Sequence, residues 1–341
     1  MNTGTGQELV SLVVCAYNQE QMIVEALEAA AAQTYSPLEI VFSDDCSTDG
    51  TYRVAQEFAA QYKGPHRLVM SRNEQNLGIA RHWDSISRKA SGRLIVHAAG
   101  DDISLPTRVA ELVAAWTGCE PRPYLLSSDG IVMSFEGVDR HPLVGLPESA
   151  VPMVQAGPKG VDYDAFDIYV PGFALAIDKR LYERLPPLTT WMWSEDDILR
   201  SRALLLGPIA YLPRALVRYR DGGLSKGTTP NRASYVDRFA RQARARLNYL
   251  EQLEQDFQQV HGPSTAFAAL LESKKATARR RLVLVGTPSF ARSLWALLVQ
   301  LALRARTDGV TRNQYVNMFL VRWFPGAFFR ARQVFRRIRP A

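Results

Sequence analysis

Strand-like and helix-like segments alternate four times within about the first 110 residues, and this alternation limits the possible folds more than any other feature. Residues 9–17 form an uncharged, β-branched run that suits a central parallel strand, and residues 38–43 form a second strand-like run. Between them, Ile23, Leu27 and Ala30 recur at helical spacing. Because right-handed connections leave few other topologies, the sequence predicts an α/β fold with a doubly wound, mixed but mainly parallel sheet.

The character of the sequence changes after this region. From Tyr124 the strand-like runs become shorter, and the connections between them become richer in proline and glycine. Residues 236–260 then form a polar segment with an amphipathic helical pattern. We therefore predict two domains, a sheet domain at 1–230 and a helical, basic extension at 231–341.

Positive charge is concentrated at the C-terminal end. The net charge is +7, yet the segment from Arg279 to Ala341 contains 13 arginines, no lysine and one acidic residue, a net charge of +12, so the preceding residues carry −5. A helical wheel of the tail puts Phe328, Val334 and Ile338 on one side and arginines on the other, as in a helix lying on an anionic membrane. A basic helix packed on its own domain or on a partner subunit is the alternative.

The cysteines and the N-terminus indicate a cytoplasmic protein. Cys15, Cys46 and Cys119 are widely spaced, which indicates neither a disulfide framework nor a zinc site. The N-terminus lacks the features of a secretory signal, and no uninterrupted apolar run reaches about 18 residues. We expect a protein that is peripheral on the cytoplasmic face of the membrane through its tail. A nucleic-acid partner is not expected, because no nucleic-acid-binding motif accompanies the basic segment.

Acidic residues cluster at three places where a strand ends or a helix begins: Asp44–Asp45, Asp101–Asp102 and Glu195–Asp197. Adjacent carboxylates repel each other, and such pairs commonly hold Mg²⁺ or Mn²⁺ against substrate phosphates. The alternatives are a solvated turn with a helix N-cap for the second cluster and stabilisation of a helix dipole for the third. After the first strand, the segment CAYNQE lacks the glycines of a dinucleotide-binding loop, which excludes a dehydrogenase of that type.

Five segments resemble, in order and spacing, the inverting family 2 glycosyltransferases of GT-A fold, the type that acts in bacterial cell-surface polysaccharide synthesis. They are LVSLVVCAYNQEQMIVEALEAAAAQTY, LEIVFSDDCSTDGT, NEQNLGIARHW, SGRLIVHAAGDDISLPTRV and WSEDDILRSRALLLG. The resemblance implies that residues 1–230 form a GT-A nucleotide-sugar transferase domain.

The resemblance also implies roles for individual residues. The donor-binding residues would be Cys15, Ala16, Tyr17, Asn18, Asp45, Arg81 and Asp101. Asp102 would hold the metal, Asp196 would be the catalytic base, and Glu195 would pair with it. Many members complete the metal shell with a histidine after a later strand. At that place this chain reads VRYRDGG, so either Asp221 substitutes for the histidine, or one carboxylate, the diphosphate and water hold the metal.

We therefore predict a metal-dependent inverting glycosyltransferase that uses Mn²⁺ or Mg²⁺. It would move a sugar from a nucleoside diphosphate sugar, with UDP or dTDP favoured, to a hydroxyl of a lipid-linked or polysaccharide acceptor. The alternative is a non-catalytic nucleotide-sugar-binding scaffold or sensor. Loss of the base would mark such a protein, and Asp196 is present.

Overall fold

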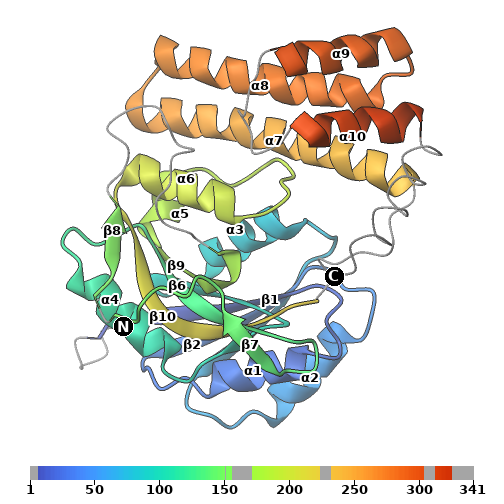
Figure 1. The fold of residues 1–341 in the computed structure, drawn as a ribbon. Coiled ribbons are helices and arrows are strands. Elements are labelled where there is room, and N and C mark those ends of the chain that lie inside the picture. Colours follow the sequence, from blue (N-terminus) through green and yellow to red (C-terminus); the bar gives the residue numbers. More distant parts are fainter. Residues whose placement is uncertain (1–6, 150, 156–170, 223–231, 303–311, 325–341) are drawn as a thin grey trace. The chain divides into compact units, whose positions relative to one another are not determined.

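A computed structural model describes residues 7–149, 151–155, 171–222, 232–302 and 312–324 (Figure 1). The chain divides into two compact units, Met1–Lys226 and Gly227–Ala341. The domain boundary predicted between residues 230 and 231 and the amphipathic tail predicted after residue 326 lie outside the described residues.

The first unit contains a sheet whose main path, in the part of the chain that the structure describes, is β3-β2-β1-β4-β9-β6-β10-β5 (Figure 1). The strands of its parallel half are β1 (Val10–Ala16), β2 (Leu38–Asp44), β3 (Arg67–Arg72) and β4 (Leu94–Ala99). β1 lies between β2 and β4, with Val10 opposite both Leu38 and Leu94. Every residue of β1 and β2 is buried, as expected for central strands that are covered on both faces.

The other half of the sheet is mixed. Its strands are β5 (Ile103–Ser104), β6 (Leu125–Met133), β7 (Asp139–Pro142), β8 (Met153–Gln155), β9 (Leu175–Asp178) and β10 (Ile209–Arg220). β9 is antiparallel to both β4 and β6, so β6 and its parallel neighbour β10 run in the same direction as β1 to β4. The predicted mixed, mainly parallel sheet is confirmed. The carboxyl ends of these strands meet at one edge, where open α/β sheets keep their ligand crevice.

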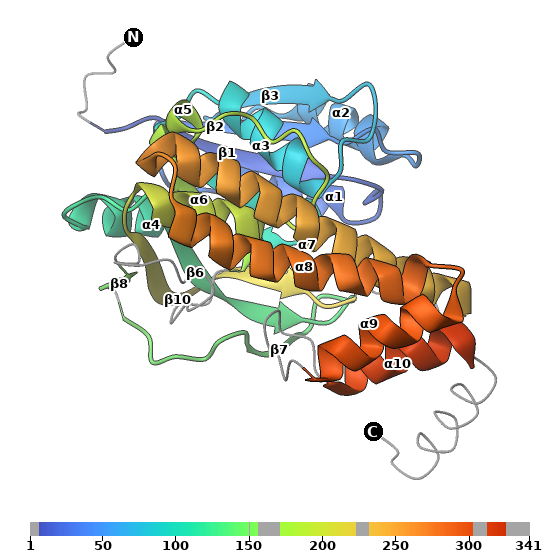
Figure 2. The same cartoon turned by 90° about the horizontal axis from the view of Figure 1, so that it is seen from above.

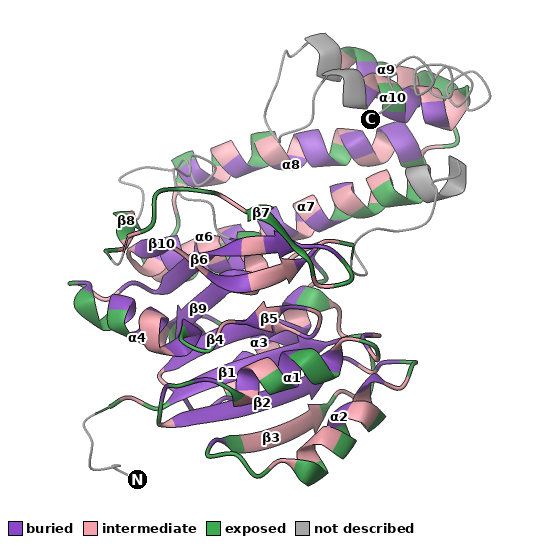
Figure 3. Cartoon of the chain, turned by 60° about the horizontal axis from the view of Figure 1, so that its bottom comes forward, coloured by how far each residue is buried: buried purple, intermediate pink, exposed green. Residues whose placement is uncertain are grey.

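Helices cover both faces of this sheet (Figure 1). They are α1 (Ile23–Ala31), α2 (Thr51–Gln61), α3 (Ile79–Lys89), α4 (Arg108–Gly118), α5 (Arg180–Arg184) and α6 (Asp196–Leu206). On one face, Leu12 and Val14 of β1 pack with Leu27 of α1 and Trp116 of α4 in the main hydrophobic core. α3, α5 and α6 lie on the opposite face. Figure 3 shows that burial is concentrated in the central strands between the two helical layers.

The second unit is helical, as predicted. Its helices are α7 (Arg232–His261), α8 (Thr265–Gly286), α9 (Phe290–Ala302) and α10 (Arg312–Trp323). α7 and α8 lie side by side (Figure 2), and Ser264 caps α8 by accepting the N–H of Phe267 (3.3 Å). α8, α9 and α10 share a separate apolar cluster that includes Leu284, Leu297 and Phe319. Within the described ranges, no helix combines the length and the apolar character needed to cross a membrane.

Candidate active site

Hydrogen bonds join the loops that follow β1, β2 and β4 at the carboxyl edge of the sheet. The N–H of Gly100 donates to the carbonyl of Cys15 (2.9 Å), and the N–H of Asp45 donates to the carbonyl of Ala16 (2.9 Å). Gly100 lies close to its neighbours, because a Cβ there would be 2.5 Å from Oε1 of Gln19, which would have to shift, and 3.0 Å from Cβ of Ala16. The fold therefore brings together the three loops that the sequence assigns to donor binding.

The turn after β1 is held against the loop after β2. Asn18 has a φ of 51°, in the left-handed region that asparagine tolerates better than most residues. Its Oδ1 accepts the N–H of Thr48 (2.8 Å), and its own N–H donates to Oγ of Ser47 (2.9 Å). The adjacent side chain of Tyr17 is 38% exposed, so its ring is open to contact with a ligand.

The thiol of Cys15 connects two parts of the site. Burial raises the pKa of this thiol well above its usual range, and the carboxylates of Glu195 and Asp45 raise it further. Glu195 belongs to a distant part of the sequence, but it packs against Gly172 of η1 (Gly172–Ala174), and η1 contacts β4, the neighbour of β1 in the sheet.

Asp45 holds the loop that leads into α3. Its carboxylate accepts hydrogen bonds from Nδ2 of Asn73 (2.8 Å), the N–H of Leu77 (2.9 Å) and the N–H of Gly78 (3.0 Å). An ionised carboxylate offers about four acceptor positions, so one remains for a ligand. In α3, the half-buried side chain of Arg81 makes no hydrogen bond or ion pair with any residue that the structure describes, and its charge is available to an anion.

Asp101 and Asp102 form an acidic pair after β4, in which Asp101 is half-buried and Asp102 is buried. Burial raises the pKa of both carboxyls, and the charge of Asp101 raises the pKa of Asp102 further. Oδ1 of Asp102 accepts the N–H of Arg220 (2.9 Å), whereas no residue in the described ranges donates to Oδ2. Burying two neighbouring negative charges is costly unless a cation compensates for them. The pair is therefore suited to a cation.

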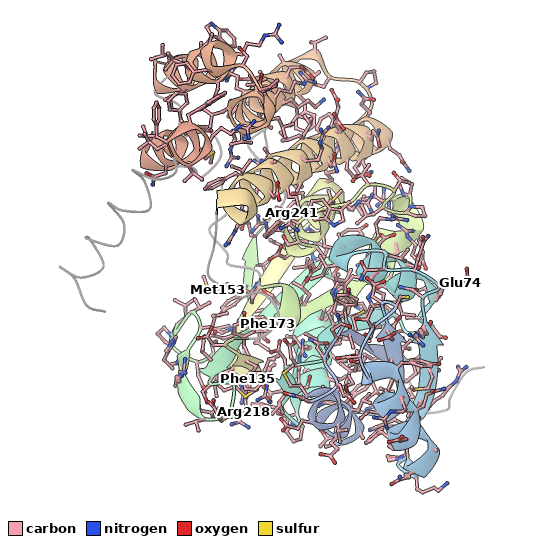
Figure 4. The ribbon with its side chains drawn as sticks, turned by 90° about the vertical axis from the view of Figure 1, so that its right-hand side faces the viewer. Glu74, Phe135, Met153, Phe173, Arg218 and Arg241 are labelled. Atoms are coloured by element: carbon pink, nitrogen blue, oxygen red, sulfur yellow. The ribbon has the colours of Figure 1, made fainter. Side chains whose placement is uncertain are left out.

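Arg220, at the end of β10, braces this pair, and the sequence did not reveal that role. Its side chain is buried and donates to the carbonyl of Asp101 (3.0 Å) and to the carboxylate of Glu25 in α1 (2.6 Å). It also donates to the carbonyl of Phe135 (Figure 4). In sequence, Arg220 is a polar residue at the end of a strand, and nothing local shows which segments surround it.

Arg108, at the start of α4, is a second buried arginine that the sequence did not single out. Its guanidinium donates to the carbonyls of His97 (2.6 Å) and Phe173 (2.9 Å), the latter labelled in Figure 4. Burial lowers the pKa of Arg108 to about 9, while the charge of Asp102 acts in the opposite direction. Arg108 thus stays charged at neutral pH, near the acidic pair.

The donor set fits a divalent cation that takes most of its ligands from a substrate. In the described part of the chain, no three His, Cys, Asp or Glu side chains are close enough together to hold a metal ion. The carboxylate of Asp221, predicted as a ligand, pairs with Nη1 of Arg140 (3.1 Å). Ions such as Mg²⁺ commonly bind one or two carboxylates, with phosphate oxygens and water as their other ligands. Asp102, beside Asp101, can serve in such a shell when a diphosphate is bound.

A second acidic pair stands at the start of α6. Glu195 is buried against η1 (Gly172–Ala174), and a Cβ on Gly172 would lie 2.4 Å from its Oε1. Burial and the neighbouring charge of Asp196 raise the pKa of Glu195 to about 8, so this carboxyl is mostly protonated at neutral pH. Asp196 is half-buried and accepts the N–H of Asp197 (2.9 Å). Asp196 is therefore the member of the pair that a substrate can reach.

A buried ion network joins α3 to α6. Asp84 accepts hydrogen bonds from Nε of Arg88 (2.9 Å), Nη1 of Arg202 (3.4 Å) and the N–H of Leu188 (3.0 Å). The network positions the start of α6 relative to α3. The sequence did not reveal it, because its partners come from segments that lie far apart in the chain.

Replacing Glu195 with glutamine is expected to weaken the pH dependence of stability. A carboxyl whose pKa is raised from 4.5 to about 8 on folding binds its proton more tightly in the folded state, so stability falls as the pH rises through that interval. Glu195 alone should lower the free energy of unfolding by up to about 1.4 kcal/mol per pH unit there. Urea unfolding between about pH 5 and 8 measures this slope.

The matched control for this substitution is Asp197→Asn, because Asp197 is the exposed neighbour of the same acidic group. Asp197→Asn should keep most of the wild-type slope, whereas Glu195→Gln should flatten it. Equal slopes in wild type and Glu195→Gln would contradict the raised pKa.

The part of the chain that matches known proteins includes the loops after β1, β2 and β4. Residues 11–125 match the family model described as "Glycosyl transferase family 2". The matched segment contains Asp45, Arg81, Asp101 and Asp102, and it ends before α6.

Two curated relatives match over the same part of the chain. The chain is 35% identical over 114 residues to the putative glycosyltransferase EpsE of Bacillus subtilis, which covers 33% of this chain and 39% of EpsE. It is 30% identical over 106 residues to the "UDP-Glc:alpha-D-GlcNAc-diphosphoundecaprenol beta-1,3-glucosyltransferase WfaP" of Escherichia coli, which covers 31% of this chain and 40% of WfaP. The chain thus matches less than half the length of either relative.

Among solved structures, the crystal structure of S. aureus TarS 1-349 in complex with UDP-GlcNAc is similar over most of both chains. The TM-score is 0.50 at 19% sequence identity, with 91% of this chain and 90% of the other covered. At this identity the likeness concerns the fold, and it agrees with the GT-A type fold expected from the sequence.

Proposed function

We propose that the chain is a metal-dependent inverting glycosyltransferase, because residues 11–125 match the family model described as "Glycosyl transferase family 2". It moves a sugar from a nucleoside diphosphate sugar to a hydroxyl of an acceptor. The observation that carries the proposal is the position of two acidic pairs: Asp101–Asp102 directly follows β4, and Glu195, beside Asp196, packs on η1, which contacts β4. The first pair suits a diphosphate bound through a cation, and the second suits an attacking hydroxyl.

The chemistry is a single displacement. Asp196 accepts the proton of the acceptor hydroxyl while the hydroxyl oxygen forms a bond to the anomeric carbon. The bond from that carbon to the diphosphate oxygen breaks, its electron pair leaves with the diphosphate, and the configuration inverts. A bound Mg²⁺ or Mn²⁺ supplies positive charge that stabilises the leaving diphosphate. Asp102 would hold that ion, Asp101 would contact the donor, and Arg81 would add a positive charge beside the diphosphate.

The proposed donor is a UDP or dTDP sugar. The remaining acceptor position of Asp45 can receive the ring N–H of uracil or thymine, and the exposed ring of Tyr17 can contact the nucleoside. In this proposal the backbone of Cys15, Ala16 and Asn18 would also contact the nucleotide. The name of WfaP specifies UDP-Glc as its donor, and this similarity supports a uridine nucleotide as the donor of the present chain.

A thermal-shift screen with UDP, dTDP and GDP sugars, each with and without Mn²⁺, tests this function. A UDP or dTDP sugar with Mn²⁺ is expected to stabilise the protein by about 2.7 kcal/mol at a concentration of about 100 times Kd. Arg81→Ala should weaken this shift without changing the Tm of the ligand-free protein, because Arg81 has no polar partner among the described residues. If no nucleotide sugar raises the Tm of the wild type, the proposal fails.

We further propose a lipid-linked or polysaccharide acceptor, and a peripheral position on the cytoplasmic face of the membrane. The name of WfaP specifies an acceptor on diphosphoundecaprenol, and the basic segment from Arg279 to Ala341 favours an anionic surface. Sedimentation with anionic and neutral liposomes compares the full chain with a chain ending at Pro325. Equal sedimentation of both chains would contradict a membrane role for the tail.

A further inference from the structure

Two exposed tryptophans stand just before the acidic group of α6. Trp191 is 37% exposed and Trp193 is 45% exposed, whereas Met192 between them is 3% exposed. The alternation places both indole rings on the outer side of this segment. The rings meet edge to face, with centroids 6.2 Å apart and planes at 87°. Tryptophan is enriched among the residues that contribute most to binding at protein interfaces.

The pair lies between the donor loop and the proposed base. Trp191 packs on the loop held by Asp45, because a Cβ on Gly78 would lie 2.9 Å from Cδ1 of Trp191. The N–H of Gly78 donates to Asp45 itself (3.0 Å). Trp193 precedes Asp196 by three residues, a length of chain that spans at most about 11 Å. A ligand seated on the two indoles therefore lies beside both parts of the site.

We propose that Trp191 and Trp193 form the acceptor platform, on which one pyranose ring of a saccharide acceptor stacks. This inference rests on the proposed glycosyl transfer and names the acceptor class of the same site. A pyranose presents C–H groups on its faces and hydroxyls around its edge. The C–H hydrogens next to oxygen carry partial positive charge, which the negative face of an indole attracts. Two perpendicular indoles contact one face and one side of the sugar and leave its other hydroxyls accessible.

The position of the platform favours an acceptor sugar over a lipid chain. A general base must lie within hydrogen-bonding distance of the hydroxyl that it deprotonates. The ring that carries this hydroxyl therefore occupies the space next to Asp196, which Trp193 borders. A lipid chain offers no hydroxyl to Asp196 at that place.

The test compares the full-length wild type with Trp193→Ala, Trp193→Phe and Trp295→Ala. Trp295 lies on α9 and is 59% exposed, so its substitution controls for the loss of an exposed tryptophan elsewhere. The probes are methyl and octyl glycosides of glucose, galactose and N-acetylglucosamine, with a UDP-sugar donor. UDP release is measured with and without each glycoside.

Trp193→Ala is expected to raise the KM for the glycoside about tenfold, whereas Trp193→Phe, which keeps an aromatic face, should raise it by no more than about threefold. The KM for the donor should change less than the KM for the glycoside in both variants. Trp295→Ala should behave as wild type.

An unchanged acceptor KM in Trp193→Ala, or an equal rise in the donor KM, would overturn the platform. An effect seen with octyl but not with methyl glycosides would also overturn it, by assigning the contact to the alkyl chain. The platform would also be overturned if the wild type released UDP to water and no glycoside increased that rate. If the wild type releases no UDP from any donor, the proposed function itself fails, which is a separate outcome.

Discussion

Replacing Asp196 with asparagine is expected to slow sugar transfer by about 10²- to 10⁴-fold, the range typical of losing a general base. An asparagine amide cannot take the proton of the attacking hydroxyl. Glu195 cannot take over the role at neutral pH, because burial and the charges of Asp196 and Asp197 keep it mostly protonated. The loss should appear in kcat, with little change in the KM for the donor, because Asp196 acts on the acceptor side.

The adjacent residue supplies the control. The carboxylate of Asp197 is 54% exposed and pairs with Arg200 (2.8 Å), so Asp197→Asn removes an acid from the same helix turn without touching the proposed base. This variant should transfer sugar at close to the wild-type rate. Full turnover by Asp196→Asn would contradict the assignment of Asp196 as the catalytic base. Circular dichroism of both variants separates a catalytic loss from a folding defect.

Replacing Asp102 with asparagine is expected to lower transfer by at least about 10²-fold, because the leaving diphosphate loses charge stabilisation. The fold should survive. An asparagine Oδ1 can still accept the N–H of Arg220, and the substitution removes a buried charge that the charge of Asp101 opposes. The sharper measurement is binding. In the wild type Mn²⁺ should strengthen binding of UDP, and in Asp102→Asn this dependence should disappear.

Asp221→Asn is the informative companion to Asp102→Asn. If Asp221 leaves its ion pair with Arg140 and completes the metal shell, its substitution should also weaken the Mn²⁺ dependence of UDP binding. If Asp221→Asn kept the wild-type Mn²⁺ dependence of UDP binding, Asp221 would be excluded as a metal ligand and Asp102 would remain the proposed one. Unchanged Mn²⁺ dependence in Asp102→Asn would contradict the metal role of the acidic pair.

Much of the architecture could be predicted because its signals are local. The uncharged run at 9–17 became the fully buried β1, and the helical spacing of Ile23, Leu27 and Ala30 became the buried face of α1. The loops that end in Asp45 and in Asp101–Asp102 follow parallel strands, so their meeting at one edge follows from the strand order. Their roles in binding and catalysis remain predictions.

The partners of the site could not be predicted in this way. Arg220 reaches Glu25 and the carbonyl of Asp101, and nothing in the sequence around Arg220 indicates either partner. β9 enters the sheet between β4 and β6, which no local pattern specifies. Strand neighbours and buried ion pairs depend on which distant segments meet, and a single sequence does not encode that in its local periodicity.

The sequence by itself determined the alternation of strands and helices and the places where acidic loops end the strands, because spacing and turn residues act over a few positions. Only the tertiary structure decided that Glu195 is buried and mostly protonated while Asp196 can be reached, because a pKa depends on the groups that surround a carboxyl in space. It likewise decided that Trp193 is exposed beside the proposed base whereas Trp116 is buried. The same side chain packs a core in one place and faces solvent in the other, according to the segments around it.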